Sequence, residues 1–148
     1  MLKNPLQFAK NWLAFELNIL RRLEFKSISI PFTMSSQLGR TLKYWNVKVV
    51  SNDLLLSAYT DAIALIENNG EVLTDEALET VLEDAYVPQY KLRNPALLDW
   101  FTETDAWWFD NVRSNIEKLG SPMEKSIASA IGMKVGDYAL SFSQETRQ

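Results

Sequence analysis

The sequence predicts a helix-rich α/β fold with a small, mostly parallel sheet near the N-terminus. Two short segments, residues 28–36 and 47–53, each have the pattern of a strand that runs into a turn. Apolar residues recur at helical spacing over residues 36–45, so the three segments form a β-α-β unit that ends in a carboxylate. We expect one domain from the length of 148 residues, with a β-α-β part (1–70), a helical part (71–134) and a last strand and tail (135–148).

Local sequence signals predict each helix and strand of the β-α-β part. An Asn-Pro pair (Asn4, Pro5) opens the first helix, alternating or β-branched residues make the two strands, and an Asn-Asn-Gly run stops the last helix. These signals predict helix, strand, helix, strand and helix over residues 4–23, 25–31, 36–45, 47–50 and 54–67.

Residues typical of helix N-caps predict the helices that follow residue 70. Thr74, Thr102 and Ser121 each precede a helical pattern with acidic residues in its first turn, where the helix dipole favours anions. An Asn-Pro pair at residues 94–95 opens a short helix. The expected elements are helices that begin near residues 75, 95, 103 and 122, the last two ending at residues 119 and 132, and a strand over residues 135–142.

The composition excludes several kinds of active site. The chain is 47% apolar and 11% aromatic, enough to build a sizeable core. It has no cysteine and no histidine, which excludes disulfides, thiolate metal sites and catalysis through a histidine base. No apolar run is long enough for a membrane span, and residues 1–10 lack the apolar core of a signal peptide. We therefore expect a cytoplasmic protein without a metal site.

Charge is distributed unevenly along the chain. Residues 1–48 carry eight basic and two acidic side chains, whereas residues 49–90 carry nine acidic and no basic ones. A basic first third could contact nucleic acid or an acidic partner. The alternative is that basic and acidic segments face each other within one fold, which the scattered placement of the basic residues favours.

The turn after the first strand, residues 32–36, is a candidate cofactor site, because ligands bind at the C-terminal ends of parallel strands. Ser35 and Ser36 could offer hydroxyls and helix N-terminal N–H groups. Such turns normally carry glycine where the backbone approaches the ligand, and here those places hold Met34 and Ser36. The alternative is a strand-to-helix turn capped by serine, which the usual capping preference favours.

Asn52 and Asp53 end the second strand. A carboxylate in this place accepts hydrogen bonds from ribose hydroxyls, and Asn52 could hold the turn or join the site. Asp53 is equally suited to cap the helix that follows.

An aromatic cluster lies in residues 100–109 and contains Trp100, Phe101, Trp107, Trp108 and Phe109. Aromatic side chains can stack on splayed bases, but at helical spacing they more often form a core or a protein interface.

Residues 30–36 resemble the first motif of the Dam-like adenine-N6 DNA methyltransferases, which reads approximately Asp-Pro-Phe-x-Gly-Ser/Thr-Gly. Three positions match and three differ: Pro31, Phe32 and Ser35 match, whereas Ile30, Met34 and Ser36 replace the acid and the two glycines. The Asn52-Asp53 pair matches the ribose-binding position of these enzymes, and the stretch around residues 100–117 is similar to their helical insertion.

The resemblance implies a Rossmann-like sheet that uses S-adenosylmethionine and DNA. The cofactor-binding residues that it implies are Phe32, Thr33, Ser35, Ser36, Asn52 and Asp53. The catalytic motif of the family, Asp/Asn-Pro-Pro-Tyr/Phe, is absent, since the nearest strings at residues 87–90 and 94–97 lack its order. No catalytic residue is therefore assigned.

We expect a degenerate or truncated methyltransferase relative of the restriction-modification type, inactive alone. It would act as a binding or partner subunit that contacts DNA, another protein or a second copy. The alternative is a helical protein–protein interaction module that docks through the aromatic cluster.

Overall fold

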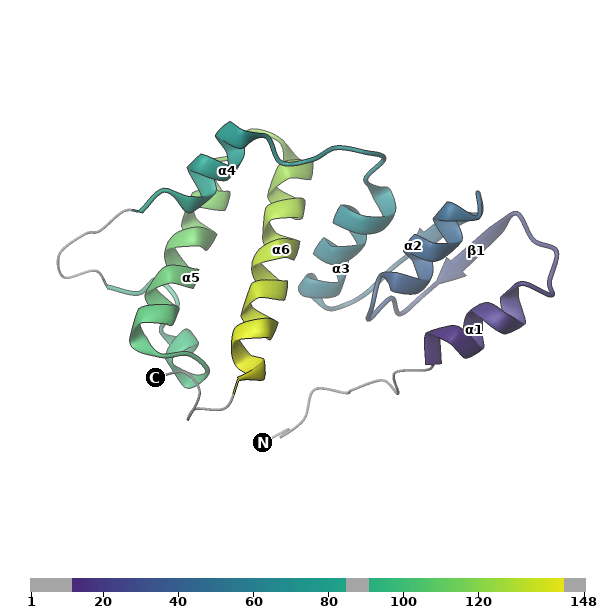
Figure 1. The fold of residues 1–148 in the computed structure, drawn as a ribbon, viewed down its shortest axis with the longest axis horizontal. Coiled ribbons are helices and arrows are strands. Elements are labelled where there is room, and N and C mark those ends of the chain that lie inside the picture. Colours follow the sequence, from purple (N-terminus) through teal and green to yellow (C-terminus); the bar gives the residue numbers. More distant parts are fainter. Residues whose placement is uncertain (1–11, 85–90, 143–148) are drawn as a thin grey trace. The chain divides into compact units, whose positions relative to one another are not determined.

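The computed structural model describes residues 12–84 and 91–142 (Figure 1). The chain divides into two compact units, Met1–Ile66 (the N-terminal unit) and Glu67–Gln148 (the C-terminal unit). Helices dominate the described residues, and a two-stranded parallel sheet lies in the N-terminal unit, which confirms the predicted α/β class. The interpretation of the chain as one domain stays a prediction.

The N-terminal unit contains the predicted β-α-β arrangement. A helix connects two strands that pair in parallel, with Ile28 opposite Val49. The predicted helix start at Asn4 and Pro5 lies outside the described residues. The elements are α1 (Trp12–Leu20), β1 (Ser27–Ile30), α2 (Gln37–Tyr44), β2 (Lys48–Ser51), α3 (Leu56–Ala62) and the π-helix η1 (Ile63–Glu67).

Gly39 allows α2 to pack closely against its neighbours. Leu42, one turn further along the same helix, is fully buried. A methyl group at Gly39 would lie 2.4 Å from Ile66 Cδ1 and 3.4 Å from Val49 Cγ1. The missing side chain therefore lets the α2 backbone approach both η1 and β2.

A Schellman motif ends α2 and directs the chain into β2. Asn46 has a φ of 59°, in the left-handed region that asparagine tolerates better than most residues. The N–H of Asn46 donates to the carbonyl of Lys43, and the N–H of Val47 donates to the carbonyl of Leu42. These bonds satisfy carbonyls that the helix end would otherwise leave without partners.

The C-terminal unit consists of α4 (Asp75–Leu82), the short 3₁₀ helix η2 (Pro95–Asp99), α5 (Glu103–Ile116) and α6 (Pro122–Ser141). The side-chain oxygens of Thr74, Thr102 and Ser121 accept backbone hydrogen bonds at the starts of α4, α5 and α6, which confirms the predicted caps. One buried cluster joins α4, α5 and α6 and comprises Ala77, Val81, Val112, Ile116, Leu119 and Ala128.

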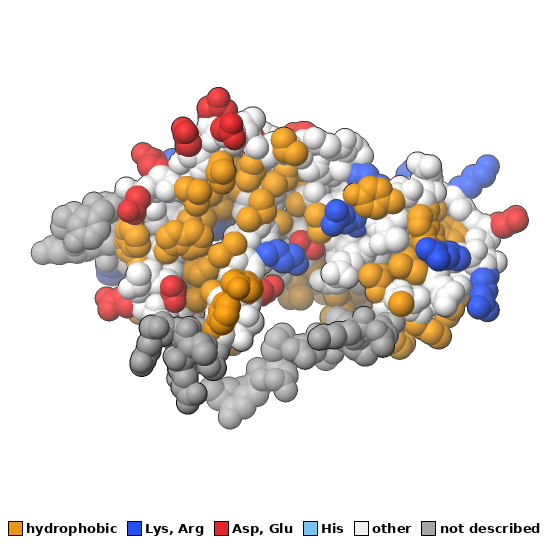
Figure 2. All heavy atoms as spheres, in the orientation of Figure 1, with side chains coloured by type: hydrophobic (Ala, Val, Ile, Leu, Met, Phe, Trp, Pro, Cys, Tyr) orange, Lys and Arg blue, Asp and Glu red, His pale blue; other side chains and the backbone are white. Residues whose placement is uncertain are grey.

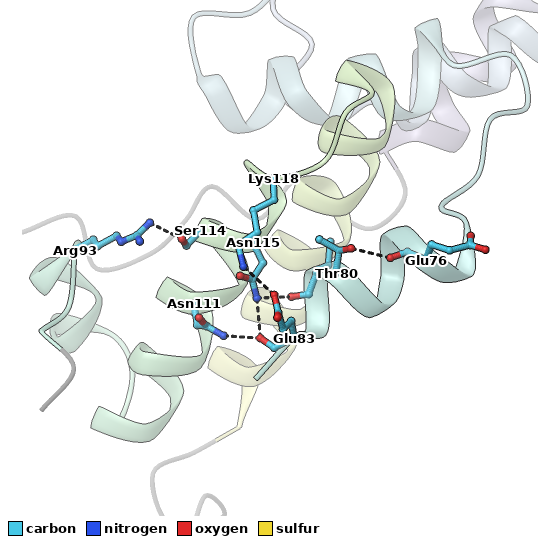
Figure 3. Close-up of polar contacts among 9 residues, drawn as sticks. Glu76, Thr80, Glu83, Arg93, Asn111, Ser114, Asn115 and Lys118 are labelled. Atoms are coloured by element: carbon cyan, nitrogen blue, oxygen red, sulfur yellow. Dashed lines mark hydrogen bonds and ion pairs between the residues drawn. The ribbon is translucent and has the colours of Figure 1, made fainter. Parts of the chain in front are cut away.

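Two asparagines of α5 hold the C-terminal end of α4 (Figure 3). Asn115, only 1% exposed, donates through Nδ2 to the carbonyls of Val81 at 3.3 Å and Glu83 at 2.8 Å. Asn111 Nδ2 donates to the same Glu83 carbonyl at 3.0 Å. At the surface, Lys118 Nζ pairs with the Glu83 carboxylate at 2.9 Å.

The strand predicted over residues 135–142 is wrong, and so is the helix end at Gly132. Helix α6 continues to Ser141. Tyr138 and Phe142 pack edge to face with their ring centroids 4.8 Å apart, a contact typical of residues four apart on a helix. Gly136 packs near the rings of Phe101 and Phe109, so helix packing outweighs the weak helix propensity of glycine.

We predict that Gly39→Ala destabilises the N-terminal unit by about 1–3 kcal/mol, because its methyl group would overlap Ile66. Thermal unfolding followed by circular dichroism measures the change. Ile66→Val in the Gly39→Ala background should recover part of the loss, since it removes Cδ1. Gly132→Ala is the control: a methyl group there meets no atom within 4 Å, so it should stabilise by about 0.5–1 kcal/mol. An unchanged melting temperature for Gly39→Ala would contradict this packing.

We also predict that Asn115→Ala costs about 1–3 kcal/mol, because it leaves a buried carbonyl of α4 without its donor. Asn111→Ala should cost less, since the Glu83 carbonyl keeps its bond from Asn115. Urea unfolding of both variants measures the difference. Equal losses would contradict this arrangement, in which both amides bond the Glu83 carbonyl and Asn115 also bonds the Val81 carbonyl.

Candidate functional site

The turns that follow β1 and β2 lie together at one edge of the sheet, because the strands are parallel and Ile30 pairs with Ser51. The N–H of Asn52 donates to the carbonyl of Ile30 at 3.0 Å. Both the N–H and the hydroxyl of Thr33 donate to the carbonyl of Asn52 at 3.1 Å. These bonds bring residues 32–36 beside residues 52–55, as the sequence predicts for a site at the strand ends.

The Asp53 carboxylate connects the two turns. Its Oδ2 accepts from the N–H of Met34 at 2.8 Å, and its Oδ1 accepts from the N–H of Leu55 at 2.9 Å. These donors, Leu55 first and Met34 second, lower the pKa of Asp53 below its usual value. A carboxylate offers about four acceptor positions, so two backbone bonds leave room for hydroxyls of a ligand.

Met34 adopts a backbone conformation that favours glycine. Its φ is 43°, in the left-handed region, and its side chain is exposed. The Asp53 carboxylate accepts a hydrogen bond from the Met34 N–H, and this bond holds the backbone conformation in place. The turn thus keeps the backbone conformation expected of glycine although the side chain is methionine.

Ser36 is 1% exposed and stands at the N-terminal end of α2. Its hydroxyl makes no capping bond, so the expected capping of this helix by Ser36 is wrong. The Ser36 Oγ has no hydrogen-bond partner among the described residues. Buried hydroxyls are nearly always partnered, so this atom is suited to a polar group that the described residues do not supply.

The remaining candidates differ in accessibility. Phe32, Ser35 and Asn52 are exposed, whereas Thr33 is buried and its hydroxyl is already bonded. Three consecutive leucines beside the site, Leu54, Leu55 and Leu56, are also exposed, Leu54 to 87%. The sequence predicts a helix from residue 54, whereas α3 begins at Leu56, so Leu54 and Leu55 lie in the turn before it.

The aromatic cluster belongs to the C-terminal unit. Phe101 and Phe109 pack with centroids 4.6 Å apart, and Trp108 meets Phe109 edge to face at 4.9 Å. Trp100 is 65% exposed and Trp108 is 37% exposed. The cluster is thus partly core and partly surface.

Charge separates the two units. The N-terminal unit carries eight basic and four acidic residues, and the C-terminal unit carries seven basic and fifteen acidic ones. Figure 2 shows Asp and Glu side chains gathered mainly over the C-terminal unit. The N-terminal unit is therefore the better match for a polyanion.

Residues 12–84 and 91–142 contain no group of three or more acidic side chains that could hold a metal ion. None of the helices in this part of the chain combines the length and hydrophobicity needed to cross a bilayer.

Comparison with known proteins finds a similarity in sequence to a methyltransferase. The chain is similar to the type II methyltransferase M2.HphI of Haemophilus parahaemolyticus, with 24% identity over 135 residues. The match covers 91% of this chain and 39% of that enzyme, so the chain spans well under half the length of this relative. No protein-family model and no solved structure matches the chain.

We predict that Asp53→Ala lowers the melting temperature at neutral pH, because the Met34 and Leu55 N–H groups lose their acceptor. The folded pKa of Asp53 lies below the ordinary value of 3.8, so its contribution is complete above that pH and is lost as pH falls through the folded pKa. Melts between pH 7 and pH 2 should therefore converge for wild type and variant at the acid end. Glu24→Ala, at an exposed position of the same unit, is the control. A difference that does not change with pH would contradict the role of the ionised carboxylate.

Proposed function

We propose that this chain is a degenerate relative of the adenine-specific DNA methyltransferases, which binds S-adenosylmethionine at the strand ends of the N-terminal unit. It works as a binding or partner subunit and not as a complete catalyst. The observation that carries the proposal is the left-handed Met34, at the position where the resembling motif has glycine.

The left-handed backbone of Met34 is strained. A left-handed conformation costs a residue with a side chain about 1–2 kcal/mol, so it persists only where the surroundings impose it. Here the Asp53 carboxylate imposes it through the Met34 N–H. A turn retained against this cost supports descent from a glycine-containing cofactor turn.

The residues at the strand ends fit such a cofactor. Asp53 would accept the ribose hydroxyls, with Asn52 beside it, and the orphaned Ser36 hydroxyl would bond a polar group of the ligand together with Ser35. Phe32 offers an exposed aromatic face for a base. Thr33 holds the two turns together through Asn52. When bound, S-adenosylmethionine supplies an activated methyl group.

A partner role follows from what the sequence lacks. It contains no Asp/Asn-Pro-Pro-aromatic string, and the nearest described one, residues 94–97, lies at the start of η2 in the C-terminal unit. The match covers 39% of the related methyltransferase, so most of that enzyme lies outside the matched region. The basic N-terminal unit would approach DNA, with a cytoplasmic restriction-modification system as the setting.

Calorimetric titration of S-adenosylmethionine and S-adenosylhomocysteine tests the cofactor site. Wild type should bind both, Asp53→Ala should bind neither, and Met34→Gly should bind several-fold more tightly because a long side chain leaves the turn. Asn46→Gly is the matched control, since it changes the other left-handed residue of this unit outside the site and should leave the affinity unchanged. Absence of binding to both wild type and Met34→Gly would refute the proposal.

A second candidate function is a helical interaction module, favoured by the 65% exposure of Trp100 in the aromatic cluster. This function requires that the exposed surface at Trp100 contact another protein. Self-association measured by sedimentation should then weaken in Trp100→Ala, and a monomeric wild type would count against a homo-oligomeric form of this module.

A further inference from the structure

Basic residues lie at the edge of the sheet opposite the candidate cofactor site. Because the strands are parallel, both begin at this edge, where Ser27 pairs with Lys48. The N–H of Lys48 donates to the carbonyl of Lys26 at 3.0 Å, so the backbones of the two lysines are neighbours. Three residues of strand rise, about 10 Å, separate this pair from the strand ends that border Asp53.

Helix α2 ends at the same edge and brings aromatic rings beside the basic side chains. The Arg21 guanidinium lies over the Trp45 ring, 5.2 Å from its centroid. Tyr44, in the last turn of α2, is 72% exposed, and the Arg40 guanidinium lies 5.8 Å from its ring centroid. We call this surface the basic edge, and it comprises Arg21, Lys26, Tyr44, Trp45 and Lys48.

The basic edge carries an excess of positive charge. Arg21, Lys26 and Lys48 are exposed, and none of them has an acidic partner among the residues that the structure describes. The connection from α1 to β1 adds one more exposed cation, Arg22, and one exposed acid, Glu24. Figure 2 shows Lys and Arg side chains gathered over this end of the N-terminal unit. The basic edge therefore fits a partner that carries several negative charges.

A single-stranded nucleic acid matches both the charge and the aromatic ring of the basic edge. Its phosphates would pair with the guanidinium and ammonium groups, and an unpaired base would stack on the exposed ring of Tyr44. Bases inside a duplex are already stacked on one another and offer no face to this ring.

We infer that the basic edge binds a single strand of DNA and holds it away from the cofactor. This inference rests on the proposed function, in which the N-terminal unit contacts DNA, and assigns that contact to the edge opposite Asp53. A strand held there lies outside the reach of a methyl group bound at the strand ends, as expected of a binding subunit.

Fluorescence anisotropy of a labelled oligothymidylate of about 16 nucleotides measures binding to the full chain at several salt concentrations. Lys48→Gln should weaken binding about threefold and lower the salt slope by about 0.7, the contribution of one phosphate contact on a single strand. Lys91→Gln is the matched control, since Lys91 is exposed in the C-terminal unit, and should change neither quantity. Tyr44→Leu should weaken binding about fivefold or more at an unchanged slope, because stacking releases no counterions.

Several results would overturn the inference. They are no binding of the oligothymidylate at low salt, equal effects of Lys48→Gln and Lys91→Gln, and tighter binding of a duplex that Tyr44→Leu does not affect. Displacement of the oligothymidylate by polyglutamate at equal charge concentration would also overturn it, because an acidic protein would then fit the edge as well.

Saturating S-adenosylhomocysteine distinguishes the basic edge from the cofactor site. It should leave the affinity for the oligothymidylate unchanged, and competition between the two ligands would place the DNA at the strand ends and contradict the inference. Cofactor binding without oligothymidylate binding would refute the basic edge alone. Oligothymidylate binding without cofactor binding would refute the cofactor site alone.

Discussion

The hydrogen bonds of the Asp53 carboxylate are the constraint on which the candidate site depends. One oxygen accepts a hydrogen bond from the N–H of Met34 in the turn after β1. The other accepts a hydrogen bond from the N–H of Leu55 in the turn after β2. This side chain thus adds to the bonds that Asn52 and Thr33 make between the strand ends, and it holds the left-handed conformation of Met34. Ionisation of Asp53 is favoured by the same bonds, so the group that shapes the site also gives it negative charge.

The sheet around this site is small, with two strands in the described part of the chain. The bare backbone at Gly39 packs closely against Ile66 and Val49. Val50 and the three leucines after β2 remain at the surface.

Features with local causes could be predicted from the sequence. The caps at Thr74, Thr102 and Ser121 depend on residues three positions apart, and the strands follow from alternation within a few residues. The extension of α6 to Ser141 could not, because it involves the packing of Gly136 near the rings of Phe101 and Phe109, which lie far from it in the sequence. For the site, the sequence predicts that Asp53 follows the second strand, as it does in the structure, but its bond to Met34 spans nineteen residues and appears only in the fold. The buried, unpartnered hydroxyl of Ser36 likewise follows from tertiary packing.

The most direct test of the account is a map of backbone amide shifts by NMR while S-adenosylhomocysteine is added to the labelled chain. A cofactor site at the strand ends predicts saturable shifts at Met34, Ser36 and Leu55. These three positions border the Asp53 carboxylate and the start of α2. Trp100 and the rest of the C-terminal unit should shift little. No shift at these three amides at millimolar ligand, or shifts confined to the C-terminal unit, would contradict a cofactor site at the strand ends.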